Sequence, residues 1–461
     1  MSTFSKYPAY KPAGVLWLRQ VPEHWEVLPL CAIARMKSIT GQSGRQLLSV
    51  YLDKGVIPFS QVTAKRTNVT SEDLSRYQAV DPGDFVLNNQ QAWRGSVGVS
   101  KYAGIVSPAY LILALSERVD PAYANALFRQ RIMVDQYMVS SRGVGTIQRN
   151  LYWPSLRRVD IFLPPVAEQQ LLAKYLHALD AKVKRYIRTK RALIARLQEQ
   201  KQAIIQRAVT RGLDPNVKLK PSGVEWLGEV PEHWEVVPIR RKATRIRTGS
   251  TPPTSQLEYY RHGTLPWHGP SSIGSSIEVG KPVKLINQAA VDHGVARVFG
   301  PGSVLVVGIG ATLGKVAHLD HLASVNQQIT AITFDERVAF GRYMAYQLKQ
   351  SEALLIGTAP IATLAILDKQ AIASFQVAVP PIEEQRRIVE ALDSELGHLE
   401  APIILAEQTL KRVNEYHTRL IADVVTGAVD VRAVAKVMDE PIDTEPMEEE
   451  PVADIAEGEQ V

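Results

Sequence analysis

Apolar residues recur at alternating intervals of four and three along residues 164–211, which predicts one long helix. The apolar positions are Leu172, Leu176, Leu179, Val183, Tyr186, Leu193, Leu197 and Ile204, with Lys190 and Gln200 as breaks. Pro164-Pro165 stands where the helix would begin and Gly212 where it would end, as helix termini prefer. The spacing is typical of a coiled-coil seam, although a helix lying on a globular core would show a similar stripe.

A second stripe of the same period predicts a second long helix near the C-terminus. Its apolar positions are Ile388, Leu392, Leu396, Leu399, Ile403, Ala406, Leu410, Val413, Leu420 and Val424. Pro402 lies inside this helix and should kink it or split it into two shorter helices. At about 1.5 Å per residue, a helix of about 45 residues is about 68 Å long. Such a length indicates a spacer between domains.

The two helices carry opposite charge. Residues 174–211 hold eleven Lys and Arg against two acids, whereas residues 383–423 hold nine acids against five Lys and Arg. Opposite charges beside apolar seams favour pairing of the helices with each other.

The intervening segments, roughly 26–162 and 235–378, predict mixed α/β domains. Short β-type runs at 85–87, 110–113 and 304–307 lie near Pro-Gly turns at Pro82-Gly83 and Pro301-Gly302.

The borders of these segments are repeated. Residues 11–29 return as residues 220–238 with fourteen of nineteen positions identical, and residues 163–170 return as residues 379–386. The interiors between the repeats share little. Repeated borders around divergent interiors indicate one scaffold that presents two different surfaces.

Charge and composition indicate which kinds of partner and cellular environment suit the chain. Residues 437–461 hold ten acids and no Lys or Arg. Because the net charge of the whole chain is +6, residues 1–436 alone have a net charge of +16. We expect the acidic tail to be disordered and the basic body to bind a polyanion, although charge can also serve only solubility. The single cysteine, Cys31, has apolar neighbours and is expected to be buried and inert, in a reducing cytoplasm. No apolar run is long enough for a membrane span.

The sequence motifs that could indicate a nucleotide, metal or catalytic site depart from the patterns that such sites need. Gly308 to Val316 is the nearest approach to a phosphate loop, but Ile309 stands where its first glycine is needed and Val316 replaces the hydroxyl, so a glycine turn between strands is expected. His318 and His321 lack metal-pair spacing. His24 and His233 recur in both borders, which favours a structural hydrogen bond beside Trp25 or Trp234 over catalysis.

The tryptophans of the borders, Trp17, Trp25, Trp226 and Trp234, are expected to pack in the domain cores. The alternative is an anchor for a partner subunit, because Trp is frequent at interface hot spots.

Taken together, the repeats resemble the specificity subunits of type I restriction–modification systems. The resemblance covers residues 11 to about 430. It rests on the paired Gly-Val-x-Trp-Leu…Val-Pro-x-His-Trp borders, the paired Pro-Pro-x-x-Glu-Gln helix starts, and the helix ends at 208–214 and 424–430. Residues 84–88 and 93–110, and separately Trp267, 310–316 and 326–328, resemble two classes of the family's target recognition domains.

The resemblance implies an α+β fold in which two α/β target recognition domains are separated by two long antiparallel coiled-coil helices, as a pseudo-two-fold tandem repeat. The expected parts are a first border (1–25), recognition domain 1 (26–163), a central helix (164–214), a second border (215–234), recognition domain 2 (235–379), a distal helix (380–430) and an acidic disordered tail (431–461).

The resemblance also implies a non-catalytic DNA-binding subunit in which each domain reads half of a bipartite, asymmetric double-stranded DNA site. The helices would set the spacing. Two methyltransferase subunits, which bind S-adenosylmethionine, and motor-nuclease subunits, which use ATP and Mg²⁺, would be the partners; this chain would hold no cofactor or metal.

Side chains that suit DNA recognition cluster in both interiors, because Arg and Lys read guanine or contact phosphates while Asn and Gln read adenine. The candidates are Lys65, Arg66, Asn88, Gln90, Gln91, Arg94, Lys101, Tyr102, Arg142, Gln148, Arg149 and Asn150 in the first, and Arg245, Arg247, Thr248, Ser250, Thr251, Thr312, Lys315, Gln327 and Gln328 in the second. The run 142–150 suits a loop that enters a groove.

Two other functions stay open. One is a DNA-binding scaffold of another defence or modification system, which co-purification with a methyltransferase would separate. The other is a diverged nuclease, for which the sequence shows no compelling carboxylate cluster.

Overall fold

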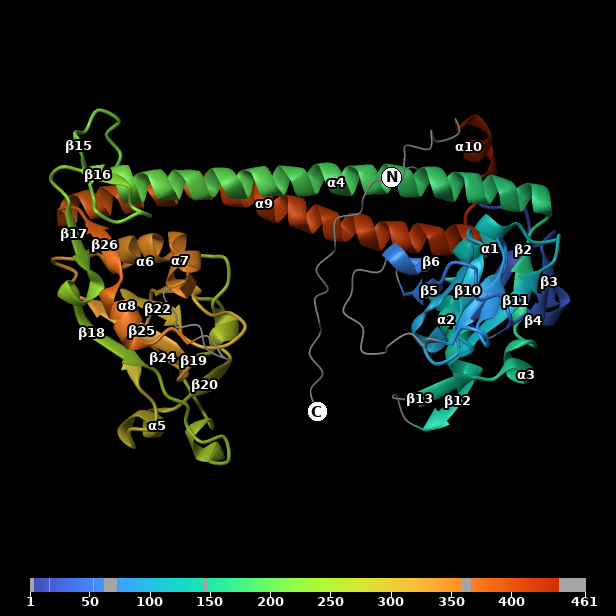
Figure 1. The fold of residues 1–461 in the computed structure, drawn as a ribbon, viewed down its shortest axis with the longest axis horizontal. Helices are drawn as coiled ribbons and strands as arrows, with labels where there is room; N and C mark the ends of the chain where they lie inside the picture. The colour runs from blue at the N-terminus through green and yellow to red at the C-terminus, as the bar shows by residue number, and fades with distance from the viewer. Residues whose placement is uncertain are drawn as a thin grey trace. The chain divides into compact units, whose positions relative to one another are not determined.

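The computed structural model describes residues 4–15, 17–52, 54–61, 73–144, 148–357 and 366–438. The chain divides into two compact units, unit 1 (Met1–Lys190 with Thr409–Val461) and unit 2 (Arg191–Gln408). The two long helices, α4 (Val166–Arg211) and α9 (Ile382–Val425), each contribute residues to both units (Figure 1). The mixed helix and sheet content confirms the expected α+β class.

Within each unit, α4 and α9 lie side by side and run antiparallel. In unit 1, Glu168 lies near Arg432 just after α9, and Asp180 lies 3.7 Å from His417. In unit 2, Lys201 pairs with Glu400, and Gly212 lies beside Glu384. As residue numbers rise along α4, the numbers of the facing residues in α9 fall, so the two helices run antiparallel. Few ion pairs join the helices, so their apolar faces account for most of the contact.

The seam of α4 differs from the predicted one in its middle. Tyr186 and Leu193 are exposed, whereas Ile187 and Ile194 are half-buried. A straight helix repeats every 3.6 residues rather than 3.5, so a stripe counted in strict heptads drifts off the contact face. Every predicted seam position of α9 is buried or half-buried.

Pro402 does not split α9, which is helical from Ile382 to Val425. The proline ring removes one backbone hydrogen bond. Pro402 and His398, four residues earlier, are both exposed, so water can satisfy the freed carbonyl. The expectation of two separate helices was therefore wrong.

Unit 1 is built around a four-stranded antiparallel sheet. Its strand order is β4 (Ala34–Lys37), β11 (Tyr110–Leu115), β8 (Phe85–Asn88) and β9 (Val97–Val99). Antiparallel pairs complete the unit: β1 (Tyr10–Val15) with β2 (Leu18–Pro22), β3 (Glu26–Pro29) with β14 (Asp160–Leu163), β5 (Leu48–Tyr51) with β6 (Gly55–Pro58), β7 (Gln78–Val80) with β10 (Gly104–Val106), and β12 (Ser141–Val144) with β13 (Gln148–Leu151). The short helices are α1 (Pro121–Phe128), α2 (Arg131–Val139), α3 (Trp153–Leu156) and α10 (Arg432–Val437).

Unit 2 repeats the same central sheet. The strand order is β18 (Ala243–Thr248), β25 (Ile329–Phe334), β22 (Ser303–Val307) and β23 (Val316–Leu319). The pairs β15 (Leu219–Pro221) with β16 (Glu229–Pro231) and β17 (Glu235–Pro238) with β26 (Gln376–Val379) match β1 with β2 and β3 with β14. The helices are α5 (Gln288–Asp292), α6 (Gly341–Gln350), α7 (Glu352–Gly357) and α8 (Lys369–Ser374).

A second sheet distinguishes unit 2. Its order is β20 (Lys284–Ile286), β19 (Leu265–His268), β24 (Ala323–Val325) and β21 (Val298–Phe299), with β19 and β24 parallel. The predicted β runs at 85–87, 110–113 and 304–307 are confirmed as parts of β8, β11 and β22.

The last described residues belong to unit 1. Val431 and Ala435 are fully buried, and Ala435 lies in α10. Residues 431–438 thus extend the packed part of the unit beyond 430, where the acidic tail was expected to start; residues 439–461 lie outside the described residues. Of the helices that the structure describes, none is long and apolar enough to span a membrane.

Candidate DNA-binding interface

The repeated borders and helix starts meet in a polar cluster around one glutamate in each unit, Glu168 in unit 1 and Glu384 in unit 2. In unit 1, Trp25 Nε1 donates a hydrogen bond to Glu168 Oε1 (3.0 Å), and His24 Nε2 lies 2.7 Å from Glu168 Oε2. In unit 2, Trp234 Nε1 donates to Glu384 Oε1 (3.1 Å), and His233 Nε2 lies 2.8 Å from Glu384 Oε2. The structural role expected for both histidines is confirmed.

The glutamines that follow these glutamates are also fully buried and equivalent. Gln169 Nε2 donates to the Pro164 and Arg118 carbonyls, and its Oε1 accepts from the Asp120 amide. Gln385 donates to the Pro380 and Val338 carbonyls and accepts from the Phe340 amide. The Pro-Pro-x-x-Glu-Gln motif therefore fixes the start of each long helix to its domain. These partners were not predicted, although Glu-Gln recurs at the start of both helices and was an available signal.

The C-terminal end of α9 packs against the cluster at the start of α4, and the C-terminal end of α4 packs against the cluster at the start of α9. Gly427, after α9, has φ +73°, and a Cβ there would lie 2.4 Å from Pro22 Cδ and 3.2 Å from Trp25. Gly212, after α4, also has φ +73°, and a Cβ would lie 3.2 Å from Trp234. Each domain is thus held by the start of one helix and the end of the other.

The border tryptophans pack as expected. Trp25 and Trp234 are almost fully buried. Trp17 packs edge-on against Phe162, and Trp226 stacks on Phe375, both half-buried against their cores. Cys31, expected to be buried, is only half-buried.

The candidate residues of unit 1 gather mainly at one end of its central sheet. The connection from β8 to β9 carries Asn88, Gln90, Gln91 and Arg94. Gln90 and Arg94 are exposed, and the Arg94 guanidinium lies 4.6 Å from the centre of the Trp93 ring. Asn88 Oδ1 accepts a hydrogen bond from the Gln90 amide, so it shapes the turn.

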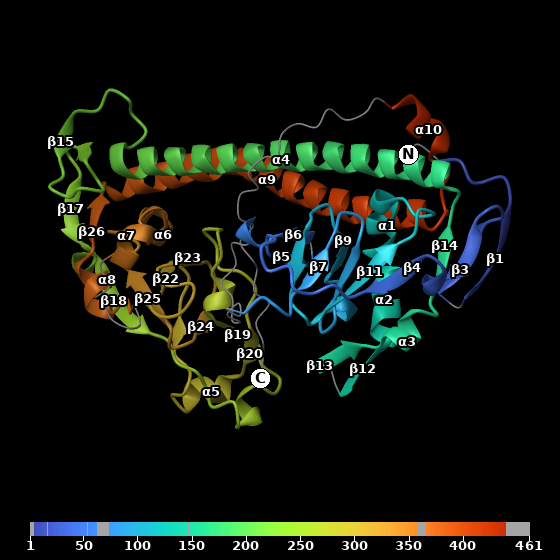
Figure 2. The same cartoon turned by 45° about the vertical axis from the view of Figure 1, so that its right-hand side comes forward.

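Residues 141–144 and 148–151 form the two strands of a β-hairpin rather than the expected loop, and residues 145–147 lie outside the described residues. Strands β12 and β13 pair antiparallel, with Arg142 opposite Asn150 and Gly143 opposite Arg149. The hairpin projects from the body of unit 1 in Figure 1 and Figure 2. Its base is joined to the β8–β9 connection, because the Leu151 amide donates to the Asn89 carbonyl (3.0 Å). The two candidate clusters therefore form one surface.

Two candidates of unit 1 lie away from this surface. Lys101 and Tyr102 follow the other end of β9, separated from Asn88 by the length of the strand, and Tyr102 packs on a core cluster. Lys65, Arg66 and the Gln148 side chain lie outside the described residues.

Most of the candidates of unit 2 occupy the equivalent end of the equivalent sheet. That end carries the C-terminus of β18, the 326–328 connection to β25, and the β22–β23 connection with Thr312 and Lys315. Gly249 must be glycine here, because a Cβ would lie 2.0 Å from the Val325 carbonyl oxygen. Thr251 donates a hydrogen bond to Gln327, and Asn326 Nδ2 donates to Gln328 Oε1 (2.9 Å).

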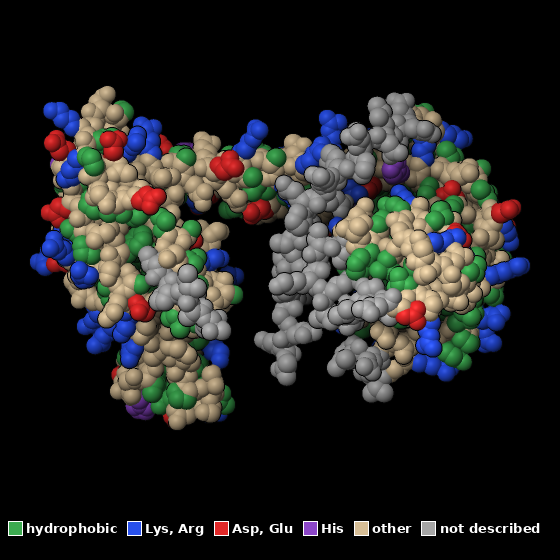
Figure 3. Space-filling view, in the orientation of Figure 1, with side chains coloured by type: hydrophobic (Ala, Val, Ile, Leu, Met, Phe, Trp, Pro, Cys, Tyr) green, Lys and Arg blue, Asp and Glu red, His purple; other side chains and the backbone are tan. Residues whose placement is uncertain are grey.

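Arg245 and Arg247 lie on the edge strand β18, two residues apart, so both point to the same face. Both are exposed, and Lys and Arg side chains gather over this strand (Figure 3). Thr248 is half-buried on the opposite face. Ser250 is structural, because its carbonyl accepts from Trp267 Nε1 (3.0 Å) and its hydroxyl accepts from the Arg297 amide (2.9 Å).

The β22–β23 connection is a glycine turn, as expected. Gly310 and Gly314 have φ of +106° and +79°, and the Leu313 amide donates to the Gly310 carbonyl. Val316 already lies within β23, so no hydroxyl stands where a phosphate loop needs one.

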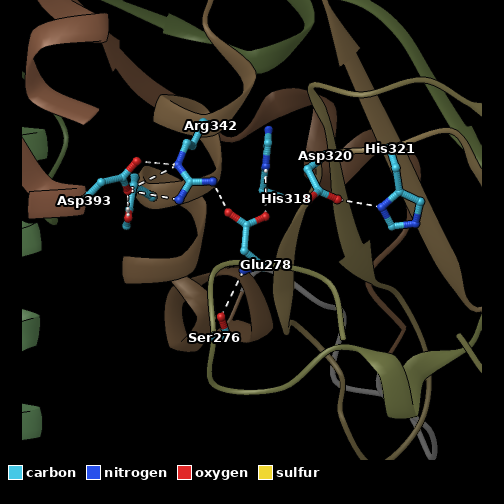
Figure 4. A network of polar contacts seen from close by, with 8 residues as sticks. Ser276, Glu278, His318, Asp320, His321, Arg342 and Asp393 are labelled. Atoms are coloured by element: carbon cyan, nitrogen blue, oxygen red, sulfur yellow. Dashed lines mark hydrogen bonds and ion pairs between the residues drawn. The ribbon is translucent and has the colours of Figure 1, made fainter. Parts of the chain in front are cut away.

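The histidines nearby belong to a polar network (Figure 4). His318 Nδ1 lies 3.3 Å from Glu278, which also binds Arg342, and Arg342 donates to Asp393 of α9 (2.9 Å). His321 instead pairs with Asp320 (2.6 Å). This network of hydrogen bonds and ion pairs connects the central four-stranded sheet of unit 2 to its helices. The described residues include no group of three or more His, Cys, Asp or Glu that could hold a metal ion.

Comparison with known proteins shows what the chain is similar to. A family model described as the type I restriction modification DNA specificity domain matches residues 231–406. The putative type I restriction enzyme MjaX specificity subunit of Methanocaldococcus jannaschii is 20% identical over 438 residues, covering 90% of this chain and 95% of that protein. Over nearly its whole length the chain is thus similar to type I restriction enzyme specificity subunits, and residues 231–406 match their DNA specificity domain.

Further comparisons agree with this specificity-subunit assignment. The EcoR124I/EcoR124II specificity subunit of Escherichia coli is 27% identical over 187 residues, covering 39% of this chain and 43% of that protein. A solved structure concerned with complex assembly and conformational transition of the type I R-M system has the same fold, with a TM-score of 0.66 and 17% identity over 89% of this chain and 99% of that one. Specificity subunits are non-catalytic, and the catalytic activities lie in other subunits.

Proposed function

We propose that the chain reads a bipartite, asymmetric DNA site, one half with each unit. The observation that carries the proposal is the equivalence of the two reading surfaces. In both units most of the described candidate side chains lie at the same end of the same four-stranded sheet, on connections whose sequences differ. A shared scaffold with different side chains is what two different half-sites require.

The contacts divide by chemistry. Arg245 and Arg247 on β18, and Lys315 before β23 at the opposite edge of the sheet, are suited to phosphates. Gln91, Arg94, Thr251, Gln327 and the hairpin residues are suited to base edges. Ser250 and Asn88 act indirectly, because their polar groups shape the turns.

The proposal extends to the partners. The long helices set the gap between half-sites and offer docking surfaces to two methyltransferase subunits, while motor-nuclease subunits complete the restriction complex. S-adenosylmethionine, ATP and Mg²⁺ belong to those partners, and the complex acts on DNA in the cytoplasm.

The test is methylation mapping in cells that express the chain with its cognate methyltransferase, beside cells that lack the chain. A split, asymmetric methylated motif that depends on the chain is expected. In the same assay, Arg94→Ala and Gln91→Ala should relax one half-site only. Equal loss at both half-sites would contradict two independent readers, and no chain-dependent methylation would favour a scaffold of another system.

A further inference from the structure

The β12–β13 hairpin presents two base-reading side chains on one face. Arg142 and Asn150 are directly opposite in the antiparallel pairing, and both are exposed. Opposite residues of such a pair point to the same face of the ribbon, with Cβ atoms about 4.5–5.5 Å apart. Arg149 points to the other face, where its neighbour Leu151 is buried in the core of unit 1. Arg142 and Asn150 therefore share the outward face of the hairpin.

Arg142 is held in place by an aromatic ring without losing its donors. Its guanidinium lies 3.4 Å from the centre of the Tyr152 ring, and Tyr152 is two residues from Asn150 and hence on the same face. Stacking occupies the flat face of a guanidinium and leaves the N–H groups at its edge available. Within the described residues, neither Arg142 nor Asn150 uses its side chain in a hydrogen bond or ion pair.

The size of this element fits DNA. The major groove admits a two-stranded β-ribbon, in which Arg bonds guanine O6 and N7 and Asn bonds adenine N6 and N7, each through two hydrogen bonds. The separation of the two Cβ atoms is comparable to one or two base-pair rises of about 3.4 Å each. We propose that the hairpin enters the major groove of the half-site read by unit 1, where Arg142 contacts a guanine and Asn150 an adenine within two base pairs of it.

This assignment rests on the proposed function and makes a narrower claim about sequence. The experiment maps methylated motifs produced by the full complex with wild-type chain and with Arg142→Ala, Arg142→Lys, Asn150→Ala and the control Arg131→Ala. Arg131 is an exposed arginine of the same unit, paired with Asp135 on α2. The wild-type half-site should contain a guanine and an adenine within two base pairs.

Both Arg142 variants should lower the preference for guanine at one position by roughly 5- to 150-fold, the range expected for loss of one bidentate contact. Lysine keeps the charge but not the planar fork, so Arg142→Lys separates base reading from a phosphate contact. Asn150→Ala should relax only the adenine position of the same half-site, and Arg131→Ala should change neither.

Three results would overturn the assignment: a half-site without such a guanine and adenine, full guanine preference in Arg142→Lys, or unchanged base preferences in both alanine variants. Arg142→Lys also covers the case in which loss of the Tyr152 contact unfolds the hairpin of Arg142→Ala. If the wild-type chain directs a bipartite motif and the variants leave it unaltered, only this assignment fails. If the wild-type chain directs no methylation, the proposed function fails with it.

Discussion

The indole nitrogen of Trp25 donates a hydrogen bond to Glu168 over 3.0 Å, joining the first repeated border to the start of α4. Glu168 also accepts from Tyr7 Oη (2.8 Å) and lies 3.6 Å from Arg432. Burial and the Glu168 carboxylate raise the pKa of Tyr7, so this hydroxyl stays a donor. Glu384 has only the Trp234 and His233 contacts among those the structure describes, and its side chain is more exposed, 19% against 7%.

Removal of these carboxylates should therefore destabilise the two units unequally. We expect Glu168→Ala to lower the free energy of unfolding of unit 1 by about 3 kcal/mol, because it leaves buried donors unpaired. Glu384→Ala should lower that of unit 2 by about 1–2 kcal/mol. Hydrogen exchange resolved by segment measures each unit separately. Glu390→Ala, at an exposed position of α9, is the control. Equal losses in both units would contradict the role assigned to Tyr7 and Arg432.

Periodicity predicted both long helices to within about five residues at each end, because a continuous apolar stripe of this spacing is regular only in a helix. Periodicity placed Tyr186 and Leu193 on the contact face of α4, where the structure has them exposed. The contact face shifts by one residue along the helix, and that shift depends on how the opposite helix packs. Repetition of the borders predicted equivalent domains. The equivalent sheets themselves could not be read from the divergent interiors, because β pairing is set by contacts distant in sequence.

The candidate residues were predicted by chemical type, and the structure sorts them by position. It joins Arg94 and Arg142 in one surface, sets Lys101 at the other end of the sheet, and shows Ser250 engaged in internal hydrogen bonds. Residue type alone could not separate these cases. The same side chains serve turns, cores and nucleic-acid contacts, and only tertiary placement distinguishes them.

The stability of unit 2 should depend on the protonation of His268. Burial, with a smaller contribution from the nearby His321, lowers the pKa of His268 from 6.5 to about 4. In the unfolded chain His268 is therefore protonated as the pH falls through about 6.5, whereas in the folded chain it is protonated only near pH 4. This contribution to stability is complete above pH 6.5 and is lost as the pH falls toward 4, by about 2 kcal/mol after allowance for solvent screening.

Urea titrations at pH 7 and pH 4.5 measure the effect. His268→Gln should flatten the pH dependence, whereas His398→Gln, an exposed histidine of α9 in the same unit, should leave the wild-type slope. An unchanged slope in His268→Gln would rule out this residue as the source.

The arginines of β18 should contribute to affinity without setting sequence. Within the described residues Arg245 and Arg247 form no ion pair, and they lie on an exposed edge strand. If each contacts one phosphate, the double variant Arg245→Ala/Arg247→Ala should reduce the slope of log K against log salt by about 2. Base preferences should persist. Arg337→Ala is the control, since Arg337 is 88% exposed and paired with Asp335. A changed motif in the double variant would instead make these arginines base readers.

The long helices should set the gap between half-sites. In unit 1 the antiparallel register places residues 184–187 of α4 near residues 411–414 of α9, as judged from Asp180 with His417 and Glu168 with Arg432. Removing both four-residue segments together keeps this register. The deletion shortens each helix by about 6 Å and turns it by about 40°, comparable to one or two base pairs of DNA.

Methylation mapping of the paired deletion should give unchanged half-sites and a gap shorter by one or two base pairs. The single deletion of 184–187 serves as a comparison, because it breaks the register with α9 and should lower methylation overall. Arg185→Ala, which keeps the length, should leave the gap unaltered. A paired deletion with normal methylation and the original gap would show that the helices do not measure the site, since only their length differs from the wild type.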